Sequence, residues 1–139
     1  MFEPENEIEN LMISAASDPK AVLEFYRALP EVELFLLTPE AIMTPGRRRA
    51  MKFNEKMNIA TVDFLNLKWH PTFTSRQRIA DYLKQPETCL GAKAKNLFKM
   101  LPKSNFWLNP LSACQKPLPA DEIALVMSGK IFDKLNHSA

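Results

Sequence analysis

The chain has 139 residues, of which 46% are hydrophobic and 24% charged, and these ordinary globular values exclude wholesale disorder and a coiled coil. Only 3 glycines accompany 11 prolines, which argues against a glycine-rich phosphate-binding loop. With 18 basic and 16 acidic residues the net charge is +2, far below the excess typical of a general nucleic-acid binder.

The sequence also indicates in which cellular compartment the protein is expected. Purely apolar runs such as Leu34 to Leu37 are far shorter than the roughly 20 residues that span a bilayer, so we expect no membrane segment. The N-terminal region is acidic and does not resemble a signal peptide. Cys89 and Cys114 form no C-x-x-C pair. We therefore expect reduced thiols in a cytoplasmic protein.

Two helices are predicted before any strand. Apolar residues at helical spacing, beginning with Ile8, predict an amphipathic helix over residues 5–16. Asp18 followed by Pro19 is typical of an N-cap with proline at the first helical position, and Pro30 ends this second helix.

The middle of the chain predicts strands. Residues 32–37 are short and rich in strand-forming types, whereas residues 38–57 lose the apolar pattern and are assigned to a long connection. Residues 59–69 are predicted as the next strand, with one buried and one solvated face. Pro71 indicates an edge, a bulge or a turn before a brief strand ending at Phe73.

Helices and strands alternate in the second half. Thr74 and Gln77 have the spacing of a capping box. The predicted elements are a helix over 75–84, an extended piece over 89–92, a helix over 94–101, a strand over 106–108 and a helix from Pro119 to Gly129.

We therefore predict a mixed α/β (α+β) fold in a single domain over residues 1–132, with a short tail at 133–139. Its central mixed sheet should have about 4–5 strands packed by about five helices, two of which precede the first strand.

An ordered set of short motifs carries a family resemblance: Phe73-Thr74-Ser75, a helix with Arg76 and Tyr82, Asn109-Pro110 after an apolar strand, Leu118, and the helix start Asp121-Glu122-Ile123. With the two helices and first strand before them, these resemble the N-terminal domain of the enhanced-serine-sensitivity (SseB) family of bacterial proteins. The resemblance is weakest over residues 41–58. It implies an α/β domain named for a growth phenotype, without catalytic residues to carry over.

No catalytic, metal or cofactor site is predicted. His70 and Cys89 lack ligand-type neighbours at metal-site spacing, and no cations surround Cys89 to activate it for sulfur transfer. Ser75 and Asp81 lack the G-x-S-x-G elbow of a hydrolase.

Two groups of residues are candidate partner-binding sites. Arg47, Arg48 and Arg49 with Lys52 form a basic cluster that is either a solvated loop or a docking site for an acidic partner. Trp69, Phe106 and Trp107 are candidates for an aromatic surface. Phe106 and Trp107 are neighbours in a strand and point to opposite faces, so both are core residues if helices cover both faces of the sheet; otherwise one of them belongs to a surface patch or a homodimer contact.

The leading hypothesis is a non-enzymatic bacterial regulatory or adaptor module of the SseB type, acting through an unidentified protein partner. One alternative is an immunity or chaperone protein for a toxin or secreted effector. Another, from a different class, is a small-molecule binder or weak enzyme of serine or sulfur metabolism, as the family resemblance implies.

Overall fold

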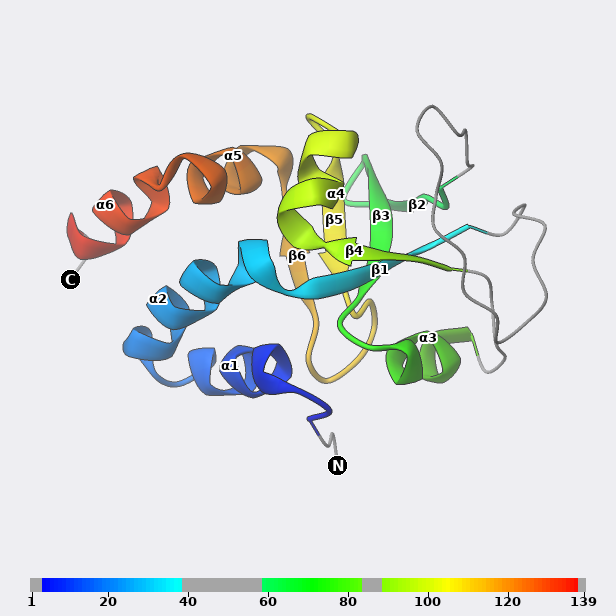
Figure 1. The fold of residues 1–139 in the computed structure, drawn as a ribbon, viewed down its shortest axis with the longest axis horizontal. Coiled ribbons are helices and arrows are strands. Elements are labelled where there is room, and N and C mark those ends of the chain that lie inside the picture. The colour runs from blue at the N-terminus through cyan, green and yellow to red at the C-terminus, as the bar shows by residue number, and fades with distance from the viewer. Residues whose placement is uncertain (1–3, 39–58, 84–88, 138–139) are drawn as a thin grey trace.

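A six-stranded sheet lies at the centre of the molecule, with helices on both of its faces (Figure 1). The computed structural model describes residues 4–38, 59–83 and 89–137. Its helices are α1 (Glu7–Ala15), α2 (Pro19–Ala28), α3 (Arg76–Leu83), α4 (Ala94–Met100), α5 (Ala120–Ser128) and α6 (Lys130–His137), with a 3-10 turn at Leu29–Glu31. Its strands are β1 (Glu33–Leu37), β2 (Val62–Phe64), β3 (Leu67–Phe73), β4 (Cys89–Lys93), β5 (Asn105–Leu108) and β6 (Lys116–Leu118). This mixed α/β fold, with two helices before the first strand, confirms the predicted class.

Side-chain caps mark the start of both N-terminal helices, and the one at Asp18 was predicted. The side chain of Asn6 accepts a hydrogen bond from the amide of Glu9 at 3.1 Å, which satisfies one free donor of the first turn of α1. Asp18 does the same for the amide of Lys20 at 3.0 Å, and Pro19 opens α2. Local cap chemistry therefore fixes the start of both helices.

The strand order is β4-β1-β3-β5-β6, and β2 also pairs with β3. Within the described residues β3 and β5 pair in parallel and the other pairs are antiparallel. Two strands share one edge of β3, since β2 pairs with its first half, up to Trp69, and β1 with Thr72 and Phe73.

Pro71 was expected at an edge, bulge or turn, but it lies inside the continuous central strand β3. It occupies the position between the part of β3 that pairs with β2 and the part that pairs with β1. Proline lacks an amide donor, so a change of partner strand is a place where the sheet tolerates it.

The prediction of one strand over residues 59–69 was wrong in part. Residues 62–64 and 67–73 are separate strands of a β-hairpin, joined by Leu65 and Asn66 with φ of 53° and 63°. The expected alternation also fails at this end, because Leu65 and Leu67 are exposed and Trp69 is buried. A two-residue turn with both φ positive has the geometry of type I′, which the sequence did not signal because it contains no glycine here.

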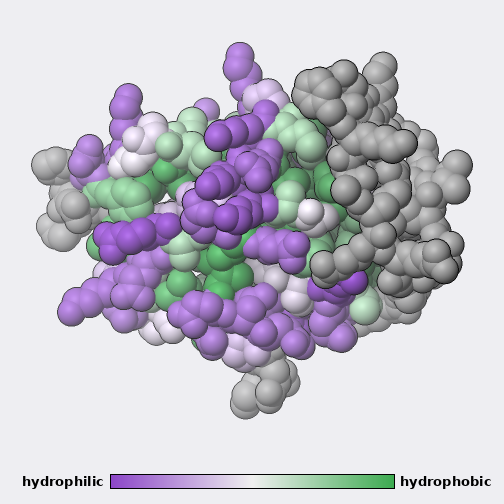
Figure 2. All heavy atoms as spheres, in the orientation of Figure 1, coloured by the Kyte–Doolittle hydropathy of each residue, from purple (hydrophilic) through white to green (hydrophobic). Residues whose placement is uncertain are grey.

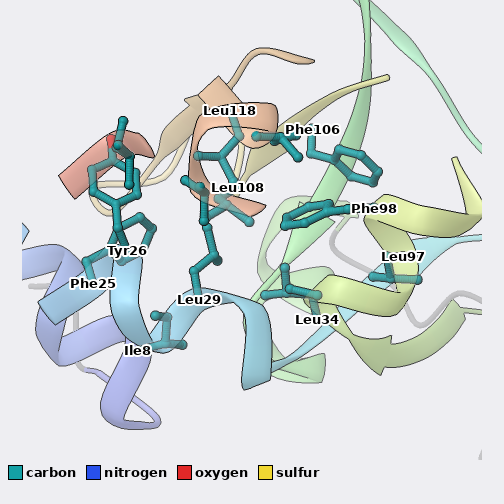
Figure 3. Close-up of a cluster of buried hydrophobic side chains, with 14 of the residues drawn as sticks. Ile8, Phe25, Tyr26, Leu29, Leu34, Leu97, Phe98, Phe106, Leu108 and Leu118 are labelled. Carbon is teal, nitrogen blue, oxygen red and sulfur yellow. The ribbon is translucent and has the colours of Figure 1, made fainter. Parts of the chain in front are cut away.

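Buried side chains lie on both faces of the sheet because successive strand residues point to opposite sides. Leu34 and Leu36 of β1 belong to the larger cluster, which packs against α1, α2, α4 and α5 (Figure 3). Phe35 and Leu37 belong to the smaller cluster, with Ile79 of α3.

The C-terminal elements extend beyond the prediction. Gly129, with φ of 80°, ends α5 in the left-handed conformation that glycine adopts readily. The chain continues directly into α6, so the residues predicted as a tail are helical as far as His137. Strand β6 was also not predicted.

Candidate functional site

Five polar side chains from segments far apart in sequence meet at the carboxyl ends of β3 and β5, and we call them the Glu9 cluster. They are Asn6, Glu9, Thr74, Arg78 and Asn109. All except Asn6 are buried, and Glu9 is 0% exposed. The cluster joins α1, the end of β3, α3 and the residue that follows β5.

A charged pair forms its centre. Nη2 of Arg78 donates to Oε1 of Glu9 at 2.7 Å, and Nε of Arg78 lies 3.2 Å and 3.3 Å from the two carboxylate oxygens. The hydroxyl of Thr74 and the amide of Glu5, the latter at 2.9 Å, also donate to this carboxylate. Nη1 of Arg78 donates to Asp81 at 3.1 Å. The buried charges are thus paired and hydrogen-bonded, as burial of an ion requires.

Burial raises the pKa of Glu9, but hydrogen bonds from Arg78, Thr74 and the Glu5 amide outweigh it and hold the pKa below its ordinary value. For Arg78, burial lowers the pKa, and the neighbouring carboxylates of Glu9 and Asp81 more than offset this, so its pKa is raised. Both groups are therefore held in their charged forms.

Thr74 is the meeting point of the cluster. Asn109 donates its side-chain amide to the Thr74 hydroxyl at 2.9 Å and accepts from the Thr74 backbone amide at 3.2 Å. Asn6 donates to the Thr74 carbonyl at 2.7 Å. The predicted capping box is therefore wrong, because Thr74 makes tertiary bonds and Gln77 donates to Asp81 instead. Asn109 itself has φ of 45°, which asparagine tolerates better than most residues.

These geometries explain the ordered motifs in structural terms. Phe73-Thr74-Ser75 connects β3 to α3, and Asn109-Pro110 follows β5 beside it. The description "SseB protein N-terminal domain" belongs to a family model that matches residues 8–125, from α1 into α5. The chain belongs to the SseB family. No curated protein and no solved structure matches it. In this SseB-family domain, the Glu9 cluster joins the motif-bearing segments.

The predicted partner-binding residues fall into two groups. Arg47, Arg48, Arg49 and Lys52 lie outside the described residues. Trp69 and Trp107 are only 2% and 6% exposed, so neither indole presents an aromatic surface. Their burial agrees with the interpretation that they are core residues. A partner-binding role for these tryptophans stays a prediction.

The tip of the β2–β3 hairpin is a surface that sequence reasoning missed. Leu65 is 69% exposed and Leu67 is 50% exposed. The ring of Phe64 stacks on Trp107 with centroids 4.1 Å apart and planes at 9°, and the indole of Trp69 donates to the Phe64 carbonyl at 2.7 Å. A rigid aromatic base thus supports two exposed leucines, which we call the hairpin tip.

His70 and Cys114 carry potentially reactive side chains, and both are in contact with other parts of the fold. His70 Nδ1 lies 3.1 Å from the Ala60 carbonyl oxygen. Cys114 is buried, and this burial, with the nearby Glu9 carboxylate, raises the pKa of its thiol to about 11.

Over the described ranges, no three His, Cys, Asp or Glu side chains are grouped so as to hold a metal ion. In the same part of the chain no helix has both the length and the apolar character needed to cross a bilayer.

Proposed function

We infer that this SseB-family domain is a non-enzymatic regulatory or adaptor module of a bacterial cytoplasm, and that it binds a protein partner through the hairpin tip. The observation that carries the proposal is Leu65, a large apolar side chain that is 69% exposed in a left-handed turn with φ of 53°.

The conformation of Leu65 is costly, and burial against the described residues compensates for little of that cost. A residue with a Cβ in the left-handed region loses about 1–2 kcal/mol relative to the right-handed one. The first position of a type I′ turn usually holds Asn, Asp or Gly for this reason. Leu65 keeps most of its surface exposed, so it gains little from burial, whereas contact with an apolar surface on a partner would supply that gain.

Neighbouring side chains favour the hairpin over other exposed sites. Leu111 is also left-handed, with φ of 63°, and is 77% exposed. It follows β5, which runs parallel to β3, so Leu111 and the hairpin tip lie at opposite ends of the sheet. The hairpin adds the half-exposed Leu67 and the stacked Phe64, and exposed apolar residues on a pre-organised base are typical of binding surfaces.

The buried titratable side chains Glu9, Arg78 and Tyr26 bind to other side chains of the fold, which supports a role without catalysis. Glu9 and Arg78 neutralise each other within the core. The hydroxyl of Tyr26 donates to Glu122 at 3.0 Å, and burial followed by the effect of Glu122 raises the tyrosine pKa. Each of these groups has a structural role in holding helices to the sheet or to each other.

Affinity purification from a native host tests the proposal. The wild-type domain should recover a stoichiometric partner, and the double variant Leu65→Asn/Leu67→Thr should recover less of it. Leu111→Asn is the matched control, since it changes another exposed left-handed leucine at the other end of the sheet. Equal recovery with the hairpin variant and with wild type would remove the hairpin tip as the contact surface.

A further inference from the structure

The turn between α4 and β5 lies beside the hairpin tip. β3 and β5 run parallel with Trp69 opposite Asn105, so both strands begin at the same end of the sheet, the upper end in Figure 1. The side-chain amide of Asn105 donates to the Lys68 carbonyl at 3.1 Å, which ties the start of β5 to the residue that follows Leu67. Segments far apart in sequence therefore form one surface here.

This surface carries exposed lysines. We call three of them the basic rim: Lys68 in β3, Lys99 near the end of α4, and Lys103 in the turn before β5. Residues 93–109 contain four lysines and no aspartate or glutamate, so this part of the chain is basic throughout. Figure 2, in the orientation of Figure 1, shows mainly hydrophilic side chains over α4.

The positive charge of the basic rim is largely left without a counter-charge. Among the residues that the structure describes, neither Lys99 nor Lys103 forms an ion pair. Lys68 lies 3.8 Å from Asp63, but these side chains are 76% and 84% exposed, and an ion pair so open to water contributes little. An excess of positive charge therefore remains beside the exposed leucines.

The apolar part of this surface extends past the hairpin. Met100, the last residue of α4, is 41% exposed. Methionine adapts its shape to different neighbours, and it is frequent at surfaces that bind peptides. Leu65, Leu67 and Met100 thus offer apolar contacts from two segments, next to the lysines of the basic rim.

The combination of charge and apolar surface specifies the chemistry of the occupant. Charge complementarity around an apolar centre is typical of protein interfaces. The phosphates of a nucleic acid would satisfy the lysines but would leave the leucines without an apolar contact. An anionic membrane would attract the lysines and repel the carboxylate of Asp63, which is two residues from Leu65. A protein segment that is both acidic and apolar satisfies all of these groups.

We propose that the hairpin tip and the basic rim together bind an acidic segment of the partner protein. Aspartate or glutamate side chains of that segment lie at the lysines, and its apolar side chains lie against Leu65, Leu67 and Met100. This inference rests on the proposed function, because it assigns a chemistry to the partner that the hairpin tip contacts.

Selection of random dodecapeptides displayed on phage, with the full chain as the target, tests the assignment. The selected peptides should combine acidic with apolar residues, and a synthetic copy of the most enriched one should bind in fluorescence anisotropy. Lys99→Gln/Lys103→Gln should weaken this binding about tenfold. Leu65→Asn/Leu67→Thr should also weaken it about tenfold. An increase in NaCl from about 0.05 M to about 0.5 M should weaken binding to the wild type more than to the lysine variant.

Lys20→Gln/Lys130→Gln is the matched control for the lysine variant. It removes the same amount of charge from two exposed lysines in the first turns of α2 and α6, so the affinity for the peptide should stay at the wild-type value. Circular dichroism checks that every variant folds.

The outcomes separate this inference from the proposed function. Peptides that lose affinity with the leucine variant, but not with the lysine variant or added salt, would overturn the inference and leave the hairpin tip as the contact surface. Loss with the lysine variant alone would overturn both. A selection that yields no acidic peptide would overturn the inference only, since affinity purification tests the partner independently. Co-sedimentation with phosphatidylserine vesicles in that case would assign the surface to a membrane.

Discussion

Glu9 and Arg78 are 69 positions apart in the chain and form a buried ion pair, with Nη2 and Oε1 2.7 Å apart. The pair connects α1 with α3, and the Thr74 hydroxyl and Asn109 extend it to the ends of β3 and β5. Because these charges are removed from water, each depends on the other more strongly than an exposed pair would.

Removal of one partner should therefore be costly. Glu9→Gln leaves the buried guanidinium of Arg78 without its main counter-charge, and we expect a loss of about 3–5 kcal/mol in the free energy of unfolding. The double variant Glu9→Leu/Arg78→Met should recover most of this loss, because no uncompensated charge remains. Urea denaturation measures both values, and a Glu9→Gln loss below about 1 kcal/mol, the level of an exposed pair, would contradict a buried role.

The lowered pKa of Glu9 predicts a pH dependence with a definite sign. A carboxyl whose folded-state pKa lies below its unfolded value stabilises the fold above the unfolded pKa and loses that contribution as pH falls through the folded pKa. The Glu9 share of stability should thus be complete above its ordinary value of 4.5 and decline at lower pH. The difference in unfolding free energy between wild type and Glu9→Gln should shrink as pH falls from 6 to 3 in about one-unit steps; a constant difference would exclude this titration.

Substitution of Gly91 in β4 by a larger residue should cause a steric clash. A Cβ atom added there would lie 2.8 Å from Cε1 of Phe35, which is closer than real Cβ contacts. Phe35 is buried in the smaller core cluster, so Gly91→Ala should cost about 1–3 kcal/mol through overpacking. Gly129→Ala is a useful comparison because nothing lies within 4 Å of its added Cβ. Its cost, about 1–2 kcal/mol, should come from the φ of 80° alone. Thermal unfolding ranks the two, and a smaller cost at Gly91 would mean that Phe35 moves freely.

Elements with local signals could be predicted from the sequence. The helical spacing of apolar residues, and for α2 the cap at Asp18, lie within a few positions of each other, so they place α1 and α2 before any tertiary contact is known. Strand β1 was predicted in the same way, from strand-forming residues between prolines.

Features set by distant contacts could not be predicted. The contact of Glu9 with Arg78 was not predicted, since no local pattern signals a partner 69 positions away. Thr74 has the spacing of a capping box, but the buried Glu9 carboxylate competes successfully for its hydroxyl. The turn at Leu65 and Asn66 lacked a glycine, so the hairpin tip had no sequence signal beyond Asn66 itself.

The hairpin tip allows one measurement in which stability and binding should move in opposite directions. Leu65→Asn places at the first turn position a residue that tolerates the left-handed conformation, so the free energy of unfolding should rise by about 1 kcal/mol. The same change removes the exposed apolar side chain that we assign to the partner contact.

The most direct test is therefore to measure unfolding free energy and partner recovery on the same Leu65→Asn protein. We predict that Leu65→Asn gives a more stable domain that recovers less partner, while Leu111→Asn gains similar stability and recovers the wild-type amount. A Leu65→Asn domain that is more stable and recovers as much partner as wild type would contradict the proposed contact surface.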